Sequence, residues 1–127
     1  MVLTDRAIAL DTLKRNVKRN CIDSDSASSK TVDVEELEWG SELGDKFTDI
    51  QVILGADIVY IEETFHLLLK TLLEITTRNK DCVVLLSSKI RYERDERFYE
   101  MMRQHFNVEQ VFYDVPRDIR IYKAHLL

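Results

Sequence analysis

The sequence predicts an α/β domain whose parallel sheet ends in an antiparallel hairpin, and three observations support that class. Two uninterrupted apolar runs, at residues 52–54 and 82–86, are typical of strands that are buried on both faces of a parallel sheet. The segment between these runs carries apolar residues at helical spacing. The last two runs, residues 108–113 and 119–125, are separated by only five residues, which permits antiparallel pairing but no parallel crossover.

The composition describes an ordinary globular chain of 127 residues that forms one domain, residues 1–127. Hydrophobic residues make up 45% and charged residues 32%, which argues against intrinsic disorder. The net charge of −5 argues against general nucleic-acid binding, and no apolar run reaches the length of a membrane span. Cys21 and Cys82 have neither metal-ligand spacing nor a disulfide pattern, and from the first residues we expect no signal peptide. We expect a cytoplasmic monomer without bound metal that binds neither nucleic acid nor membrane.

The first elements are a strand end, a helix, a loop and a short strand. Residues 1–4 resemble the end of a strand. A helix is predicted over residues 7–20, because apolar residues recur on one face: Leu10, Leu13 and Val17. Residues 21–30 are rich in Ser and Asp and predict a solvated loop with the highest mobility in the chain. Residues 31–37 alternate in polarity and predict a short strand.

The middle of the chain alternates between strands and helices. After a loop or short helical turn at residues 41–48, a strand is predicted over residues 49–55. The following helix has the apolar stripe of a helix that packs on a sheet: Phe65, Leu68, Leu69, Leu72 and Leu73. The strand at residues 82–86 leads to a helix over residues 93–105, whose apolar positions also have helical spacing: Phe98, Met101, Met102 and Phe106.

A candidate site follows the strand at residues 49–55, where the sequence continues through Gly55, Ala56 and Asp57 to Tyr60. Ligands of open α/β sheets bind at the carboxyl ends of strands, so an acidic residue in this position is well placed for chemistry. The alternative is that Asp57 only caps the following helix. The pattern alone leaves both interpretations open.

Four short motifs resemble those of a known enzyme family. They are Thr4-Asp5, Leu37-Glu38-Trp39-Gly40, Leu54-Gly55-Ala56-Asp57-Ile58-Val59-Tyr60 and Lys89-Ile90-Arg91-Tyr92-Glu93-Arg94-Asp95. In this order, and with a terminal antiparallel hairpin, they resemble the methyltransferase-like protein-lysine methyltransferases. That resemblance implies a Rossmann-like seven-stranded methyltransferase fold and S-adenosyl-L-methionine as the cofactor. It covers the whole chain and is strongest to members that act on heat-shock chaperones of the seventy-kilodalton class.

The resemblance also indicates what this chain lacks. The family has the strand order 3-2-1-4-5-7-6, and its first strand is followed by a glycine-rich turn that cradles the cofactor. The three glycines of this chain, Gly40, Gly44 and Gly55, form no such turn. We therefore expect the C-terminal part of a methyltransferase domain, from the second strand onward. The strands at residues 2–4 and 52–54 would then either pair directly or leave a vacancy between them.

Three residues are matched to the cofactor site by the resemblance. Asp5 would accept hydrogen bonds from the ribose hydroxyls, Trp39 would pack on the adenine, and Ala56 would let the adenine approach closely. Two of these residues have structural alternatives. Asp5 could cap the helix that starts near Ala7, and Trp39 could be a core residue.

Asp57 and Tyr60 would form the lysine site. A carboxylate holds the incoming ammonium group, and an aromatic ring or its phenol fixes the direction of that group. The charge run from Arg91 to Asp95 is typical of a solvated helix start, and its position after a strand raises the alternative of a peptide-docking role.

The sequence thus predicts an S-adenosyl-L-methionine-dependent protein-lysine N-methyltransferase whose protein substrate is a heat-shock chaperone or a similar protein. The alternative is a catalytically inactive fragment that does not bind the cofactor and is at most a protein-interaction module. The missing glycine-rich turn favours this alternative for the 127 residues alone.

Overall fold

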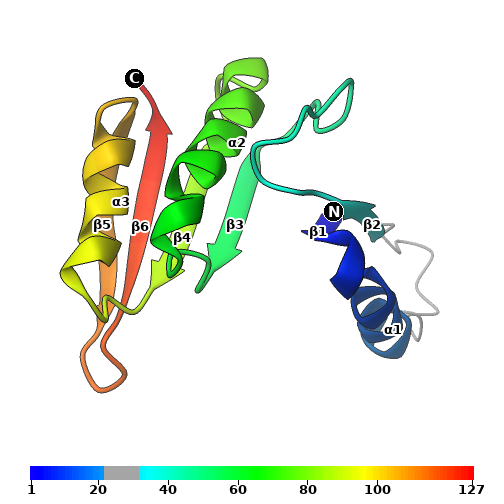
Figure 1. Ribbon diagram of the computed structural model, residues 1–127, viewed down its shortest axis with the longest axis horizontal. Coiled ribbons are helices and arrows are strands. Elements are labelled where there is room, and N and C mark those ends of the chain that lie inside the picture. The colour runs from blue at the N-terminus through cyan, green and yellow to red at the C-terminus, as the bar shows by residue number, and fades with distance from the viewer. Residues whose placement is uncertain (22–31) are drawn as a thin grey trace. The chain divides into compact units, whose positions relative to one another are not determined.

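The computed structural model describes residues 1–21 and 32–127. These residues form two compact units, residues 1–41 and residues 42–127, and each unit contains its own sheet (Figure 1). Apart from Cys21, the loop predicted over residues 21–30 lies outside the described residues, so its expected mobility stays a prediction.

The first unit is built on two parallel strands. Strand β1 (Val2–Asp5) pairs with β2 (Asp33–Glu36). Between them in the chain, the 3-10 turn η1 (Ala7–Ala9) leads into helix α1 (Leu10–Cys21). The predicted helix is confirmed, and the three residues of its predicted apolar stripe are half-buried: Leu10, Leu13 and Val17.

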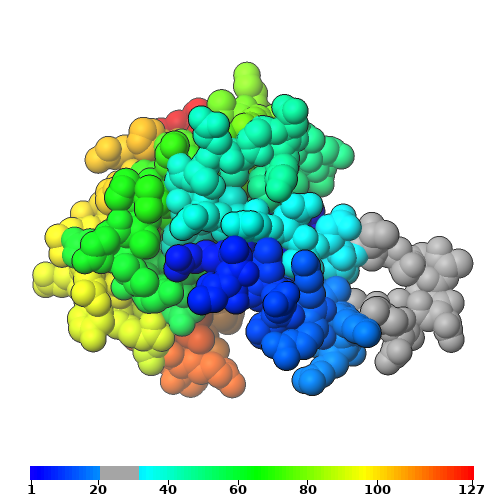
Figure 2. Space-filling model, turned by 45° about the vertical axis from the view of Figure 1, so that its right-hand side comes forward, coloured from blue at the N-terminus to red at the C-terminus, as the bar shows by residue number. Residues whose placement is uncertain are grey.

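The second unit contains a four-stranded sheet with the order β3-β4-β6-β5. Strands β3 (Val52–Ala56) and β4 (Val83–Ser88) are parallel, whereas β6 (Ile119–Leu126) is antiparallel to both β4 and β5 (Phe106–Asp114). The turn between β5 and β6 extends beyond the end of the sheet and is orange in Figures 1 and 2. The predicted terminal hairpin is confirmed.

Two helices cover one face of this sheet (Figure 1). The 3-10 turn η2 (Glu62–Thr64) precedes α2 (Phe65–Arg78), and α3 (Glu93–Arg103) lies beside it. The core between helices and sheet includes a series of aromatic rings. The Phe98 ring meets those of Phe65 and Tyr99 edge-on, with centroids 5.5 and 5.4 Å away, and Tyr99 stacks on Tyr122 at 3.9 Å. This packing confirms the predicted apolar face of α2. It also confirms Phe98 and Met102 on α3, whereas Phe106, which was predicted on the face of that helix, is the first residue of β5.

The strand order agrees with the methyltransferase fold that the resemblance implies. Strands β2-β1 correspond to the family's 3-2, and β3-β4-β6-β5 correspond to its 4-5-7-6. In the family order the first strand separates the strands that correspond to β1 and β3, and among the described residues these two strands belong to different sheets. The predicted α/β class is confirmed, and of the two expected outcomes at this position, direct pairing of β1 and β3 does not occur.

One prediction about β3 is wrong. Its apolar run predicted a strand buried on both faces, but β3 is an edge strand, and the side chains of Val52 and Leu54 are 51% and 76% exposed. The apolar run shows only that both faces of the strand are able to pack against other elements. In the structure, both described helices of this unit cover the same face of the sheet, and Val52 and Leu54 lie on the other face. Parallel strands normally have both faces covered.

The buried Tyr99 phenol predicts that the second unit loses stability at alkaline pH. Burial raises the pKa of Tyr99 above its usual range, although its hydrogen bond with Ser88 acts in the opposite direction. The folded state holds this proton more tightly than the unfolded state. The contribution of Tyr99 to the free energy of unfolding is therefore constant below pH ~10 and falls as the pH rises further, by at most about 1.4 kcal/mol per pH unit. We expect Tyr99→Phe to reduce this slope in urea unfolding measured at several alkaline pH values.

The slope, and not the stability at neutral pH, is the relevant quantity. Tyr99→Phe also leaves the buried Ser88 hydroxyl without its partner, which costs about 1–3 kcal/mol at every pH. Some alkaline sensitivity will remain, because burial also raises the pKa of Tyr122. Equal slopes in the variant and the parent chain would contradict the prediction.

Candidate functional site

The carboxyl end of β3 presents an exposed carboxylate on an unusual backbone. Asp57 follows the last residue of β3 and has a φ of 55°, in the left-handed region that side chains other than Asn, Asp and Gly rarely adopt. Its N–H donates a hydrogen bond of 2.9 Å to the Ser87 carbonyl of β4, while its side chain is 63% exposed. A non-glycine residue in this region is common at functional sites.

Gly55 allows the chain to turn closely over β4 before it reaches Asp57. A Cβ atom at this position would lie 2.6 Å from Ile58 Cδ1 and 2.7 Å from Leu86 Cδ2, so a larger residue would force these side chains to move. The glycine therefore serves close packing beneath the turn, and the sequence places it where the strand ends.

The structure places the three predicted residues of this region at the same end of β3. Ala56 ends the strand, Asp57 follows it, and Tyr60 lies before η2 with 52% of its surface exposed. The capping alternative for Asp57 is not supported, since η2 begins five residues later and has Ile61 as its N-cap, without a side-chain capping bond.

Arg91 is a member of this site that the sequence did not reveal. Its Nη1 donates a hydrogen bond of 3.1 Å to Asp57 Oδ1, although the sequence suggested only a helix start or a peptide-docking role for it. The strand order could have indicated this contact. Because β3 and β4 are parallel neighbours, the loops that follow them start at the same end of the sheet.

The loop that carries Arg91 is anchored by a buried acid. Asp95 in the first turn of α3 is 2% exposed, and its Oδ2 accepts hydrogen bonds from the N–H groups of Arg91 and Tyr92, at 3.0 and 3.2 Å. A carboxylate near a helix N-terminus is favoured by the helix dipole. The backbone of residues 91–92 is therefore fixed to α3. This helix begins at Glu93 as predicted, but its start is not solvated throughout, because Asp95 is buried.

The first unit contains the other two predicted site residues. Because β1 and β2 are parallel and Asp5 lies opposite Glu36, both strands end at one edge of their sheet. The Leu37 N–H donates to the Asp5 carbonyl at 2.9 Å. Trp39 follows in a turn with Gly40, which has a φ of 83°, and the indole is half-buried.

The Asp5 carboxylate remains able to accept further hydrogen bonds. Its Oδ1 accepts the N–H of Arg6 at 2.7 Å, and Oδ2 has no hydrogen-bond partner among the described residues. The capping alternative is not supported, because the N-cap of η1 is Arg6 and no side chain caps that turn. Asp5 and Trp39 thus lie in one unit, while Ala56, Asp57, Tyr60 and Arg91 lie in the other.

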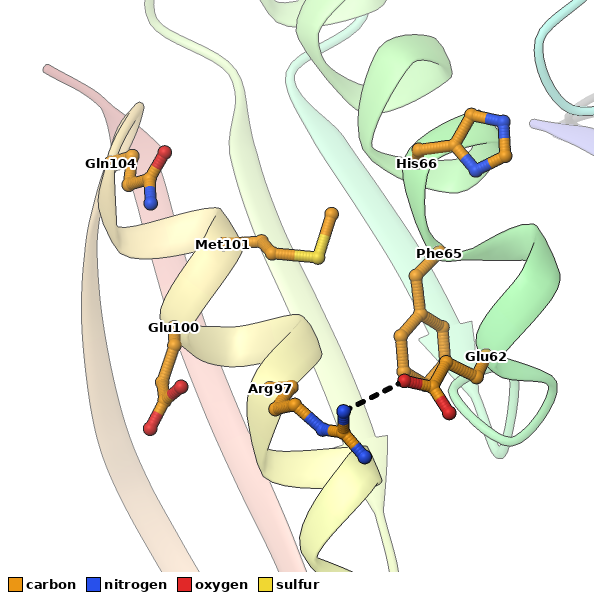
Figure 3. A pocket seen from close by; sticks show the side chains of 7 residues that line it. All are labelled: Glu62, Phe65, His66, Arg97, Glu100, Met101 and Gln104. Carbon is orange, nitrogen blue, oxygen red and sulfur yellow. Dashed lines mark ion pairs between the residues drawn. The ribbon is translucent and has the colours of Figure 1, made fainter.

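A separate cleft lies between the outer surfaces of α2 and α3 (Figure 3). Its volume is about 280 Å³, and Arg97 Nη1 pairs with Glu62 Oε1 across it at 3.0 Å. The residues that line it are Glu62, Phe65, His66, Arg97, Glu100, Met101 and Gln104. None of the predicted site residues is among them, so we assign no function to this cleft.

Within residues 1–21 and 32–127, no cluster of His, Cys, Asp or Glu side chains is arranged to hold a metal ion. In the same ranges, no helix combines the length and the apolar character that crossing a membrane requires.

Comparison with known proteins identifies related enzymes. The family model for lysine methyltransferases matches residues 1–105. The protein N-lysine methyltransferase METTL21A of Danio rerio is 48% identical over 126 residues, which cover 98% of this chain and 55% of that protein. The METTL21A of Xenopus tropicalis is 44% identical, covering 99% of this chain and 56% of that protein.

A more distant relative has a different named substrate. The EEF1A lysine methyltransferase 3 of Xenopus tropicalis is 33% identical, and the match covers 98% of this chain and 53% of that protein. The chain therefore spans about half the length of the curated relatives that it matches. With a family model that matches most of its residues, the chain belongs to the lysine methyltransferase family.

Proposed function

We propose that this chain functions in the S-adenosyl-L-methionine-dependent N-methylation of protein lysine residues. The observation that carries the proposal is the exposed Asp57 carboxylate, which lies beyond the end of β3 on a left-handed backbone and beside Arg91, in a member of the lysine methyltransferase family. An exposed carboxylate at a strand end can hold a lysine ammonium group.

The first unit offers groups that fit the adenosine part of this cofactor. Ribose has two adjacent hydroxyls that need acceptors, and among the described residues Asp5 Oδ2 has no hydrogen-bond partner. Trp39 offers a flat apolar face of the kind that stacks on a purine. Ala56, the last residue of β3, is proposed as a further cofactor-binding residue. When bound, the cofactor supplies an electrophilic methyl group carried on a sulfonium.

Asp57 and Tyr60 are proposed as the catalytic residues of the lysine site. Asp57 Oδ2 has no partner among the described residues and is free to accept a hydrogen bond from the ammonium group. Tyr60, three residues further along, would direct the amine through its ring or hydroxyl. Holding a nucleophile in line with the group that it attacks is the main contribution that a protein makes to such a displacement.

The proposed substrate is another protein. A heat-shock chaperone of the seventy-kilodalton class is our first candidate, because the sequence motifs are most similar to those of enzymes that act on it. The name of one relative makes EEF1A a second candidate substrate. We further propose that the chain acts as a monomer in the cytoplasm.

We also propose that these 127 residues are the C-terminal part of a larger catalytic domain, with the first strand and its glycine-rich turn encoded upstream. The separate sheets and the length of the relatives support this view. In-frame coding sequence before Met1, containing a strand and a Gly-x-Gly-type turn, is the expected finding. Its absence would favour a second candidate function, a non-catalytic interaction module. That candidate is also supported by the edge of β3 with which no other described strand pairs.

Calorimetric titration with S-adenosylhomocysteine tests the cofactor proposal. We expect the chain extended by its upstream sequence to bind this product, and Trp39→Ala to weaken binding by about 5- to 150-fold, because a stacked base contributes ~1–3 kcal/mol. Phe112→Ala, which removes a ring that is 56% exposed in the hairpin, serves as the control. Absence of heat with both the extended and the 127-residue chain would contradict the proposal.

The reaction itself is tested by mass spectrometry. Purified chaperone and EEF1A are incubated with the extended chain and S-adenosyl-L-methionine, and a mass increase on a lysine residue is the expected result. If the extended chain bound S-adenosylhomocysteine but methylated no lysine, the cofactor proposal would stand. The lysine-site proposal would then be wrong for these substrates, and another acceptor group would have to be sought.

A further inference from the structure

We propose that Arg91 is a positioning residue for the lysine site, which orients the Asp57 carboxylate and favours the neutral, reactive form of the incoming lysine. This inference rests on the proposed function, because it concerns how Asp57 meets a lysine. It starts from one contact, the hydrogen bond of 3.1 Å between Arg91 Nη1 and Asp57 Oδ1.

The contact involves only one of the two oxygens of the Asp57 carboxylate. Arg91 engages Oδ1 alone, so Oδ2 remains available to an ammonium group. A carboxylate on an exposed loop would otherwise rotate among several rotamers, and a charge-assisted hydrogen bond to one oxygen restricts that rotation. The backbone contributes as well, because the Asp57 N–H is bonded to the Ser87 carbonyl.

Arg91 can hold Asp57 because its own backbone is held. The buried Asp95 accepts the N–H of Arg91 at 3.0 Å and that of Tyr92 at 3.2 Å. The support thus runs from α3 through the loop at residues 91–92 to the end of β3. The ion pair itself is 45% exposed on Arg91 and 63% on Asp57, so it contributes little to the stability of the fold.

The charge of Arg91 has a second effect. Only a neutral amine attacks a methyl group, so the lysine ammonium must first lose a proton to solvent water, while its nitrogen keeps the electron pair. Asp57 alone would stabilise the ammonium and delay this loss, because an opposite charge nearby favours the charged form. A guanidinium beside the same carboxylate opposes that effect, and the lysine then loses its proton at a lower pH.

Other charged groups lie on the same loops and on the turns that follow them. The Glu62–Arg97 pair at 3.0 Å and the Arg94–Asp95 pair at 4.0 Å each combine opposite charges, so their fields largely cancel. The remaining charged residues on these segments are exposed: Glu63, Lys89, Glu93 and Glu96. Arg91 is the one for which the structure gives a direct bond to Asp57.

The test compares Arg91→Gln with a matched control, Arg97→Gln. Both arginines form an exposed ion pair of nearly equal length, 3.1 Å for Arg91 and 3.0 Å for Arg97, but only the first involves Asp57. In the extended chain that methylates lysine, Arg91→Gln is expected to move the acid limb of the kcat profile to higher pH by roughly 0.5–1 unit. Arg97→Gln should leave it unchanged.

Two further measurements distinguish the effect of the Arg91 charge from structural effects of the substitution. Arg91→Lys keeps the charge and should retain the pH profile of the parent enzyme. High salt should shrink the difference between Arg91→Gln and the parent, because the groups are exposed and their interaction is screened. A pH profile of Arg91→Gln that coincides with that of Arg97→Gln would overturn the proposed effect of charge.

A second readout does not depend on activity. Three-bond NMR couplings of Asp57 in the extended chain, without substrate, report whether its χ1 angle occupies one rotamer. We expect one rotamer in the parent chain and in Arg97→Gln, and averaging in Arg91→Gln. Averaging already in the parent chain would overturn the positioning role, whereas failure of the proposed function would instead be seen as a lack of lysine methylation by the parent enzyme.

Discussion

Asp57→Asn is expected to lower the rate of lysine methylation by about 100-fold or more, with little change in the affinity for S-adenosylhomocysteine. The reason is that loss of the carboxylate charge removes the group that aligns the lysine, and misalignment of a reacting group costs at least that factor. Asparagine is the appropriate replacement, since residue 57 has a φ of 55° and asparagine tolerates this region better than alanine.

Single-turnover methylation and calorimetry on the extended chain measure these two quantities separately. Glu62→Gln is the control, because Glu62 is also an exposed carboxylate paired with an arginine, at 3.0 Å, and it is not bonded to Asp57. Loss of S-adenosylhomocysteine binding in Asp57→Asn would assign Asp57 to the cofactor site instead. Unchanged methylation would remove it from the site altogether.

Phe98→Ala is expected to destabilise the second unit by about 3–5 kcal/mol. Phe98 is fully buried, and its ring contacts those of Phe65 and Tyr99, so its removal leaves a cavity between α2, α3 and the sheet. A loss of this size approaches the whole stability of many small domains, about 5–15 kcal/mol. Urea unfolding followed by circular dichroism measures it.

Phe112→Ala provides the comparison for this variant. It deletes a ring of the same size from the hairpin, but the ring is 56% exposed, and we expect a change within about 0.5 kcal/mol. If the two variants unfolded at the same urea concentration, the packing of the aromatic core described here would be wrong.

The order of the elements could be predicted because the amphipathic pattern is local. The stripe from Phe65 to Leu72 and the buried run at Val84 and Leu86 depend on spacing within one segment, and both were predicted. The exposure of Leu54 could not be predicted in this way. An apolar strand has the same sequence whether or not its second face is covered.

The residue types of the candidate site could be predicted, but the hydrogen bond between Asp57 and Arg91 could not. The position of Asp57 at a strand end followed from the order of elements, and the structure agrees. Its bond to Arg91 joins residues 34 positions apart in the chain, and such a pairing depends on strand adjacency and on the φ of 55° at Asp57, neither of which a sequence pattern contains. The roles of Asp5, Trp39, Ala56, Asp57 and Tyr60 remain predictions.

One edge of β3 affects the behaviour of the 127 residues on their own. Among the described residues, the edge of β3 that faces away from β4 has no partner strand, and β3 carries the exposed side chains of Val52 and Leu54. Such an edge is a template on which another chain can add. We infer that these residues, produced alone, will self-associate as their concentration rises, and that any segment able to lie along this edge would act as a solubilising cover.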